Sequence, residues 1–382
     1  MTEASQDIRP FTAAVSQESL DDLKDRLDRT RWTRDIPGSG ADYGTSLTQL
    51  KRLVAYWRDG YDWRAFEARL NDYPQFLTNI DGQDIHFLHV RSPEPDALPL
   101  ILTHGWPGSV AEYLDVIGPL TDPRAHDRDP ALAFDLVIPS LPGFAFSAPM
   151  TRTGWGTHRT AAAWVELMRR LNYQERYGAA GNDAGSMISP EIGRLDPEHV
   201  VGVHVTQVFS FPSGDPSEFN ELDEADQAAL AKLQWFMDHK ISFNQLHSQQ
   251  PQTIAHALAD SPAGLLGWNA QLMTDDAMGE RSLDDDFILD NVALYWLTNT
   301  GGESIRFYYE NAHAPRAADP TTVPLGLAGF QGDFSGVRRF AERDHKNITQ
   351  WNLHQEPGGH YAAHQEPQVL ADDIRNFYAV LA

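Results

Sequence analysis

A carboxylate stands in the segment Gly181-Asn182-Asp183-Ala184-Gly185, between a predicted strand and a predicted helix. The segment has the pattern small-x-nucleophile-x-small, in which small residues allow the sharp turn that projects the central side chain above a sheet edge. A carboxylate in that position can attack an electrophilic carbon and form an ester whose acyl part belongs to the enzyme. The alternative is that Asp183 caps a helix in a glycine-rich loop.

His360 is the predicted general base. It lies in the segment 358–363, after the last predicted strand and before the C-terminal helix. A histidine can remove a proton from water, and in folds with a nucleophile elbow the base comes last in the chain. His364 follows at the i+4 spacing of a metal-binding pair, but no third ligand stands nearby in the sequence. We therefore expect neither a metal nor an organic cofactor, and the alternative for His360 is a chance position among 15 histidines.

Asp333 is the carboxylate expected to orient His360. It follows the apolar run 323–330, and the carboxylate that orients the general base is expected at the end of a late strand. Glu356 is closer to His360 in the sequence but lies outside a strand-end position. The alternatives to Asp333 are Glu342, Asp344 and Glu356.

The loop His104-Gly105-Trp106-Pro107-Gly108-Ser109 follows the short apolar run 98–103. Hydrolysis of an ester needs two N–H groups that hold the oxyanion. One is expected from the residue after the nucleophile, Ala184, and the other from this loop, at Trp106. The alternative is an ordinary turn rich in glycine and proline.

These residues require a sheet whose strands end at one edge. Buried-strand and hairpin patterns occur at 76–80, 85–90, 98–103, 134–139, 178–180, 200–208, 323–330 and 348–354, and no strand pattern occurs before about residue 76. Helical patterns alternate with the strands, which predicts a mostly parallel sheet covered on both faces. From 212 to about 318 the pattern is helical throughout, an insertion longer than any ordinary loop.

The composition narrows the classes of partner. The 382 residues carry a net charge of −24, which disfavours nucleic acid and anionic membranes as partners. The absence of cysteine excludes a thiol nucleophile and a thiolate metal site. The polar N-terminus lacks a signal-peptide pattern and no apolar run is long enough to span a bilayer, so a cytoplasmic location is expected.

Together, Asp183, Asp333, His360 and the loop at 104–109 give the chain a specific resemblance to microsomal-type epoxide hydrolases, and the resemblance covers nearly the whole sequence. It implies an α/β-hydrolase fold with an N-terminal helical extension and an inserted helical cap. The implied divisions are an extension at 1–95 that wraps the core, core segments at 96–211 and 321–382, and a cap at 212–320.

The resemblance also implies a reaction. The segment 306–310 is similar to the end of the family's cap domain, where a tyrosine, here Tyr308, binds and protonates the epoxide oxygen. Asp183 would open the epoxide, and water activated by His360 would release a vicinal diol. Two other classes remain: a haloalkane dehalogenase-like hydrolase, against which Ala184 argues because those enzymes have tryptophan there, and a non-catalytic ligand-binding protein on the same scaffold.

The cap departs from the family pattern at Phe243, which stands where relatives carry a first tyrosine. A second oxygen donor is then missing, or is supplied by Trp235, His239 or His247. The aromatic side chains predict a hydrophobic, aromatic epoxide as substrate, and bacterial members of this branch suggest a role in secondary-metabolite biosynthesis. If the chain associates, a homodimer is the expected form. The predicted substrate-binding residues are Trp235, Phe236, His239 and Phe243.

Overall fold

A mixed sheet forms the centre of the protein. The computed structural model describes residues 7–220, 222–274, 280–315 and 319–381. Within them the sheet has nine strands in the order β1-β2-β3-β5-β4-β6-β7-β8-β9. Neighbours from β5 to β9 are parallel, whereas β1, β2 and β3 pair antiparallel. The strands are β1 (Arg9–Phe11), β2 (Gln75–Ile80), β3 (Gln83–Val90), β4 (Leu98–Thr103), β5 (Phe134–Pro139), β6 (Tyr177–Gly181), β7 (Val200–Val205), β8 (Leu325–Gly332) and β9 (Ile348–Gly359).

The prediction that no strand precedes residue 76 is wrong. β1 pairs with β2, with Pro10 opposite Phe76. A strand of three residues has too few positions for an alternating pattern, and its hydrogen bonds depend on β2, which lies far along the chain. The strands expected from 76 onward are confirmed within a few residues at each end.

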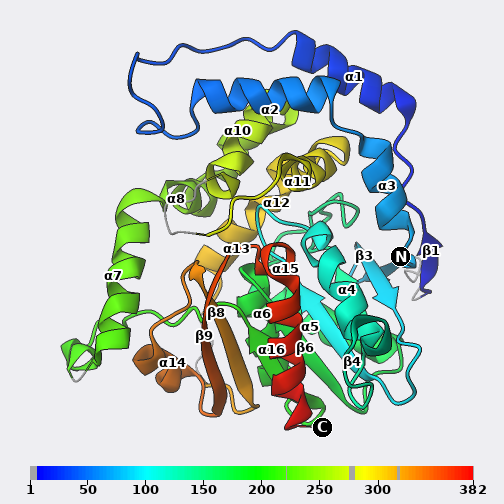
Figure 1. Cartoon of the computed structure of the whole chain (residues 1–382), viewed down its shortest axis with the longest axis vertical. Helices are drawn as coiled ribbons and strands as arrows, with labels where there is room; N and C mark the ends of the chain where they lie inside the picture. The colour runs from blue at the N-terminus through cyan, green and yellow to red at the C-terminus, as the bar shows by residue number, and fades with distance from the viewer. Residues whose placement is uncertain (1–6, 221, 275–279, 316–318, 382) are drawn as a thin grey trace.

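Helices cover both faces of the sheet, as predicted (Figure 1). α4 (Leu114–Thr121) and α16 (Pro367–Ala379) pack side by side on one face. α5 (Thr157–Arg170) and α6 (Ala184–Leu195) pack together on the other. The remaining short helices of the core are η1 (Val110–Tyr113), η2 (Pro123–His126), α14 (Arg338–Asp344) and α15 (Ala362–Gln365).

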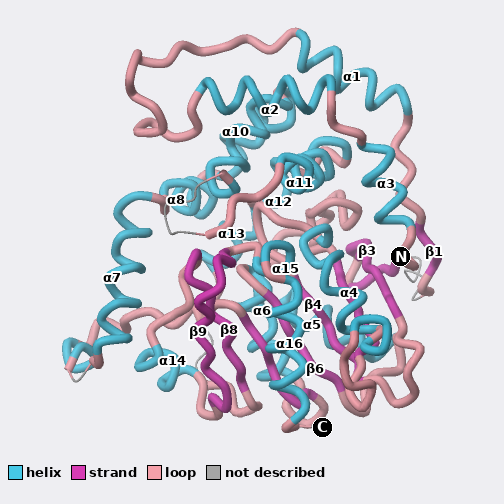
Figure 2. The backbone as a smooth tube through the Cα atoms, in the orientation of Figure 1, coloured by secondary structure: helices cyan, strands magenta, loops and turns pink. Residues whose placement is uncertain are grey.

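The predicted helical insertion is confirmed. Every element described between β7 and β8 is a helix, and most of these helices lie above the sheet in Figure 2. They are η3 (Pro216–Phe219), α7 (Glu224–His239), α8 (Ser242–Gln249), α9 (Pro251–Asp260), α10 (Pro262–Met273), α11 (Asp285–Leu297), α12 (Gly301–Ser304) and α13 (Arg306–His313).

The N-terminal helices α1 (Gln17–Asp28), α2 (Leu47–Asp59) and α3 (Trp63–Asn71) lie against these inserted helices (Figure 1). The Tyr56 hydroxyl donates to Asp286 at 2.6 Å, and the Tyr61 hydroxyl donates to Asp290 at 2.8 Å. Because β1 joins the sheet, the N-terminal segment contacts both the sheet and the inserted helices. Among the described residues, no helix is both long and apolar enough to cross a membrane.

Candidate active site

Asp183 lies at the turn between β6 and α6, in a strained backbone conformation with φ 48° and ψ −117°. Left-handed values are costly for a residue with a side chain, and such strain concentrates at functional sites. Gly185 makes the turn sterically possible, because a Cβ atom there would overlap the carbonyl oxygen of Thr103. The local geometry is that of a nucleophile elbow carrying a carboxylate.

Two backbone N–H groups hold the Asp183 carboxylate. Trp106 donates to Oδ1 at 2.9 Å, and the N–H group of Ala184 also hydrogen-bonds to the carboxylate. Gly105 permits this close approach, because a Cβ atom there would overlap the carboxylate. The two predicted oxyanion donors therefore both bind the Asp183 carboxylate. In an ester of Asp183, the oxygen that does not react would become the carbonyl oxygen that such donors stabilise.

His360 lies between two carboxylates. Its Nε2 atom is 3.8 Å from Asp183 Oδ2, and its Nδ1 atom is 2.9 Å from Asp333 Oδ2. The alternative acids are paired elsewhere: Glu342 with Arg338, Asp344 with Arg343 and Glu356 with His354. Of the four carboxylates considered from the sequence, the structure brings Asp333 to His360.

The charges of His360, Asp183 and Asp333 depend on one another. Burial disfavours the imidazolium of His360, but the carboxylates of Asp333 and Asp183 outweigh that effect and raise its pKa to about 10. Burial raises the pKa of Asp183, while His360 and the N–H groups of Trp106 and Ala184 oppose the rise. Burial also acts against the Asp333 carboxylate, but the His360 charge and its hydrogen bonds hold the pKa of Asp333 below its ordinary value.

Gln207 is a member of the site that sequence reasoning missed. Its Oε1 atom accepts from the backbone N–H of Asp183 at 2.7 Å and from the hydroxyl of Ser186 at 3.0 Å. Its Nε2 atom donates to the carboxylate of Asp333. No motif marks this glutamine, and its position just after β7 is the one signal that could have identified it.

Glu112 is a second missed residue. It is buried, and Asn182 donates to its Oε2 atom at 3.2 Å while also donating to the backbone oxygen of His360 at 3.2 Å. Burial raises the pKa of Glu112 to about 8, although the His360 charge and the Asn182 hydrogen bond act against the rise. A neutral carboxyl group therefore lies beside the candidate base at pH 7.

Tyr308, on α13, packs against Trp106 of the loop at 104–109. Its ring centroid lies 6.0 Å from that of Trp106, 5.9 Å from that of Phe243 and 5.0 Å from that of His247. Burial and the charge of Asp183 raise the pKa of Tyr308 well above its ordinary value, so the hydroxyl keeps its proton. This cluster of Trp106, Phe243, His247 and Tyr308, here called the aromatic wall, includes the residue whose backbone N–H group binds the Asp183 carboxylate.

The four predicted substrate-binding residues fall into two groups. Phe243 stacks on Trp106 with centroids 5.3 Å apart, within the aromatic wall. On α7, the partly exposed Trp235 stacks on the exposed His239 at 5.4 Å, and Phe236 packs against the hydrophobic core. Of the four, Phe243 is the one whose ring the structure places against Trp106 within the described residues.

His364 points to a different environment from His360. Its Nδ1 atom bonds to Asp115 at 2.7 Å and its Nε2 atom to Asp284 at 3.1 Å. The two histidines therefore do not converge on one point. In the part of the chain that the structure describes, no group of three or more histidine or carboxylate side chains is arranged to hold a metal ion.

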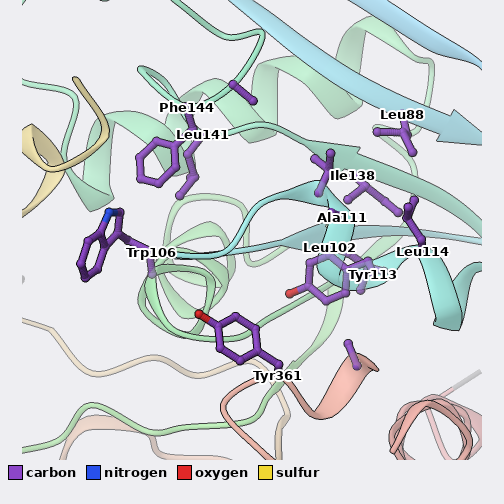
Figure 3. Packing of buried hydrophobic residues seen from close by; sticks show 14 of the residues in the cluster. Leu88, Leu102, Trp106, Ala111, Tyr113, Leu114, Ile138, Leu141, Phe144 and Tyr361 are labelled. Carbon is purple, nitrogen blue, oxygen red and sulfur yellow. The ribbon is translucent and has the colours of Figure 1, made fainter. Parts of the chain in front are cut away.

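A polar cavity of about 260 Å³ reaches His360 and Tyr361 from the side of α2 and α10. Figure 3 shows Tyr361 below the loop that carries Trp106, with its hydroxyl on the side of the ring nearer that loop. His360 is therefore among the residues that line a cavity large enough for water. Its polar lining includes Gln49, Arg52, Thr274, Ser282, Asp285 and Gln365.

Comparison with known proteins identifies the family. The chain is 42% identical to a Stigmatella aurantiaca protein named "Putative epoxide hydrolase", over 98% of this chain and 85% of the relative. It is 32% identical to epoxide hydrolase 1 of Sus scrofa, over 98% of this chain and 89% of the relative. The chain belongs to the epoxide hydrolase family. Two family models agree with this assignment: the epoxide hydrolase N terminus matches residues 8–113 and the alpha/beta hydrolase fold matches residues 99–259.

Solved structures of epoxide hydrolases share the whole fold. The Aspergillus niger epoxide hydrolase superimposes with a TM-score of 0.86 at 31% identity, covering 100% of this chain and 98% of that one. The juvenile hormone epoxide hydrolase of Bombyx mori gives a TM-score of 0.90 at 26% identity, covering 99% and 96%. The α/β-hydrolase fold with its N-terminal extension and inserted helices is therefore that of the epoxide hydrolase family, as the resemblance implied.

Proposed function

We propose that this enzyme adds water to a hydrophobic epoxide through a covalent ester on Asp183 and releases a vicinal diol. One observation carries the proposal: the Asp183 carboxylate lies between the N–H group of Trp106, at 2.9 Å, and the Nε2 atom of His360, at 3.8 Å. A carboxylate held in this way has one side for a reacting carbon and a base beside it for the second step.

In the first step an oxygen of Asp183 attacks an epoxide carbon, and the bond from that carbon to the ring oxygen breaks. The ring oxygen gains negative charge and needs a proton donor. Tyr308 fits this role because its hydroxyl stays protonated and its ring packs on Trp106 at 6.0 Å. The product is an ester of Asp183 that carries a free hydroxyl group on the neighbouring carbon.

Ester formation prepares the second step. The free enzyme holds a proton on His360 because two carboxylates raise its pKa to about 10. Esterification removes the charge of Asp183, so the pKa of His360 falls and its proton is released toward the phenolate of Tyr308. His360 is then neutral and able to act as a base at the moment when a base is required.

In the second step His360 removes a proton from water, and the hydroxide attacks the carbonyl carbon of the ester. The N–H groups of Trp106 and Ala184 stabilise the resulting oxyanion. Collapse of this intermediate breaks the acyl–oxygen bond, and the departing alkoxide takes the proton of the new carboxyl group. The cycle therefore consumes one water and restores ionised Asp183, protonated His360 and protonated Tyr308.

The aromatic wall favours an apolar substrate. Phe243 and Trp106 are buried, and their stacked rings present carbon surface next to the nucleophile. Aromatic rings contribute large contact areas and prefer offset or edge contacts with other rings. We therefore favour an aryl-substituted epoxide, with styrene oxide as the probe.

The test is a single turnover of styrene oxide with enzyme in excess, in water enriched with heavy oxygen. The label is expected in the peptide that contains Asp183, because hydrolysis exchanges a carboxylate oxygen, and the diol should carry none. Asp183→Asn should reduce the first-turnover rate at least about 1,000-fold. Label that enters the diol directly would overturn the ester route.

A further inference from the structure

His247, on α8, is a fully buried histidine in the aromatic wall. Its Nε2 atom accepts a hydrogen bond from the indole N–H of Trp268 at 2.9 Å. An indole N–H group can only donate, so Nε2 carries no proton. Burial lowers the pKa of His247 to about 3, and the neutral ring must therefore carry its proton on Nδ1.

The Nδ1–H group of His247 is buried and has no hydrogen-bond partner among the described residues. Its surroundings are aromatic: the ring centroid of His247 lies 4.7 Å from that of Trp106 and 5.0 Å from that of Tyr308. Nδ1 and Nε2 lie on different sides of the imidazole, so Nδ1–H points away from Trp268. An unpaired buried donor is costly for a folded protein, and such groups require an explanation.

The contacts of His247 with two residues of the site suggest an explanation for this unpaired donor. Trp106 holds the Asp183 carboxylate through its backbone N–H group, and His247 packs edge-on against the indole ring of the same residue. Tyr308, the donor proposed for the ring oxygen, also packs against His247. Phe243, also in the aromatic wall, has no hydrogen-bonding atom on its side chain, so it cannot be a further donor to the epoxide oxygen.

We propose that His247 is a catalytic residue whose Nδ1–H group donates a second hydrogen bond to the epoxide oxygen while Asp183 opens the ring. This inference rests on the proposed function. Tyr308 transfers its proton to the oxygen, whereas His247 keeps its own and stabilises the negative charge by hydrogen bonding alone. Trp268 is a positioning residue, because its indole fixes the tautomer that makes His247 a donor.

The indole N–H group of Trp106 is also buried without a partner among the described residues. Figure 3 shows this nitrogen on the part of the ring nearer Phe144 and away from Tyr361. His247 contacts Tyr308 directly, and its donor is fixed by a hydrogen bond to a second residue. These contacts favour His247 over the Trp106 indole as the second donor.

Two amide substitutions separate catalysis from structure. In His247→Asn the amide nitrogen can occupy the place of Nδ1, so the donor is kept while the acceptor for Trp268 is lost. In His247→Gln the amide group reaches the place of Nε2, so the bond to Trp268 is kept while the Nδ1 donor is lost. Catalysis by the donor predicts that the asparagine variant is the more active, and a purely structural role predicts the opposite order.

The experiment measures ester formation from styrene oxide in single turnovers by rapid quenching, together with the rate of ester hydrolysis. We expect His247→Gln to slow ester formation about 100-fold, the loss typical of one donor to a developing negative charge. His247→Asn should lose less than about fivefold, and ester hydrolysis should change less than about threefold in both variants. Trp268→Phe should slow ester formation to an intermediate extent, because the tautomer is no longer fixed.

Equal losses in the two amide variants, the reverse order, or no loss in either would overturn the assignment of His247. A loss in Trp106→Phe that matches the loss expected for His247→Gln, with both His247 variants fully active, would transfer the role to the indole and also overturn it. Failure of the proposed function is distinguishable, because the wild-type enzyme would then form no ester on Asp183 with any epoxide tested.

Discussion

The side chain of Gln207 connects the backbone of Asp183 to the carboxylate of Asp333. It accepts from the Asp183 N–H group at 2.7 Å and donates to Asp333 Oδ2, the oxygen that also bonds His360. The strained turn at Asp183 and the carboxylate that bonds His360 therefore share one amide group. A change at Gln207 should affect both steps of the reaction, but unequally.

Gln207→Leu is expected to slow ester hydrolysis about 10–100-fold and ester formation less than about fivefold. The substitution leaves the buried N–H of Asp183 unpaired, which costs about 1–3 kcal/mol of stability, and removes one donor that holds Asp333. Thr206→Val is the matched control. The Thr206 hydroxyl donates to Gln207 Oε1 at 2.9 Å, the oxygen that also accepts from the Asp183 N–H group, but it does not contact Asp333. Rapid-quench kinetics would contradict the prediction if both steps slowed by the same factor.

The pKa of His360 should depend on the charge of Asp183. Asp333 and Asp183 raise it to about 10, so Asp183→Asn is expected to lower it by removing one of the two carboxylates. The sign follows from electrostatics, because a nearby negative charge favours the imidazolium. NMR titration of the histidine side chains measures this value. Asp115→Asn is the control: it should lower the pKa of His364, which is raised to about 9, and leave that of His360 unchanged.

Glu112 should make the protein less stable as the pH rises. Its pKa is raised from 4.5 to about 8 in the folded chain, so its contribution to stability is fully present below pH 4.5 and is lost as the pH rises toward 8. The stability of the wild type relative to Glu112→Gln should fall by about 2–4 kcal/mol across that interval, measured by urea unfolding.

Glu67 serves as a control because its contribution to stability should change with pH in the opposite direction. Burial raises its pKa, but hydrogen bonds from Val15 and Arg64 outweigh burial and lower the pKa below 4.5. Its contribution is therefore present above pH 4.5 and is lost as the pH falls. A difference between wild type and Glu112→Gln that stays constant from pH 5 to pH 9 would contradict the assignment of Glu112.

Gly185→Ala should prevent formation of the elbow. The added Cβ would overlap the carbonyl oxygen of Thr103, which belongs to a central strand and cannot move aside. We expect a loss of at least about 3 kcal/mol, or no soluble protein. Gly267→Ala on α10 is the control, since its Cβ would meet the flexible Leu50 side chain at 3.3 Å, and its effect should stay within about 1 kcal/mol. Equal thermal stability of the two variants would contradict this reading of the turn.

The sequence was most informative where local pattern and chain order coincide. Strand ends in a parallel sheet meet at one edge, so Asp183, Asp333 and His360 could be expected to approach one another from their positions after predicted strands. The distances of 3.8 Å and 2.9 Å around His360 agree with that expectation. Their catalytic roles stay predictions until the kinetic tests are made.

Other features depend on contacts between distant segments, which leave no local pattern. Gln207 contacts the turn at Asp183 and the distant carboxylate of Asp333, and the environment of Glu112 arises from packing around Asn182. The edge strand β1 exists because β2 offers it hydrogen bonds. The stacking of Trp235 on His239 could not be predicted either, because aromatic composition does not reveal which neighbour a side chain contacts; their role in substrate binding stays a prediction.

The attachment of the N-terminal helices to the inserted helices has a consequence for protein engineering. Arg52 pairs with Asp285, and the hydroxyls of Tyr56 and Tyr61 bond to Asp286 and Asp290 on α11. A chimera that exchanges the inserted helices with those of a relative would lose these contacts wherever the incoming α11 carries other side chains, unless α1 to α3 were exchanged as well. The unit that can be transplanted between family members is therefore discontinuous in the chain, and recombination libraries with one crossover on each side of the insertion should yield mostly unstable proteins.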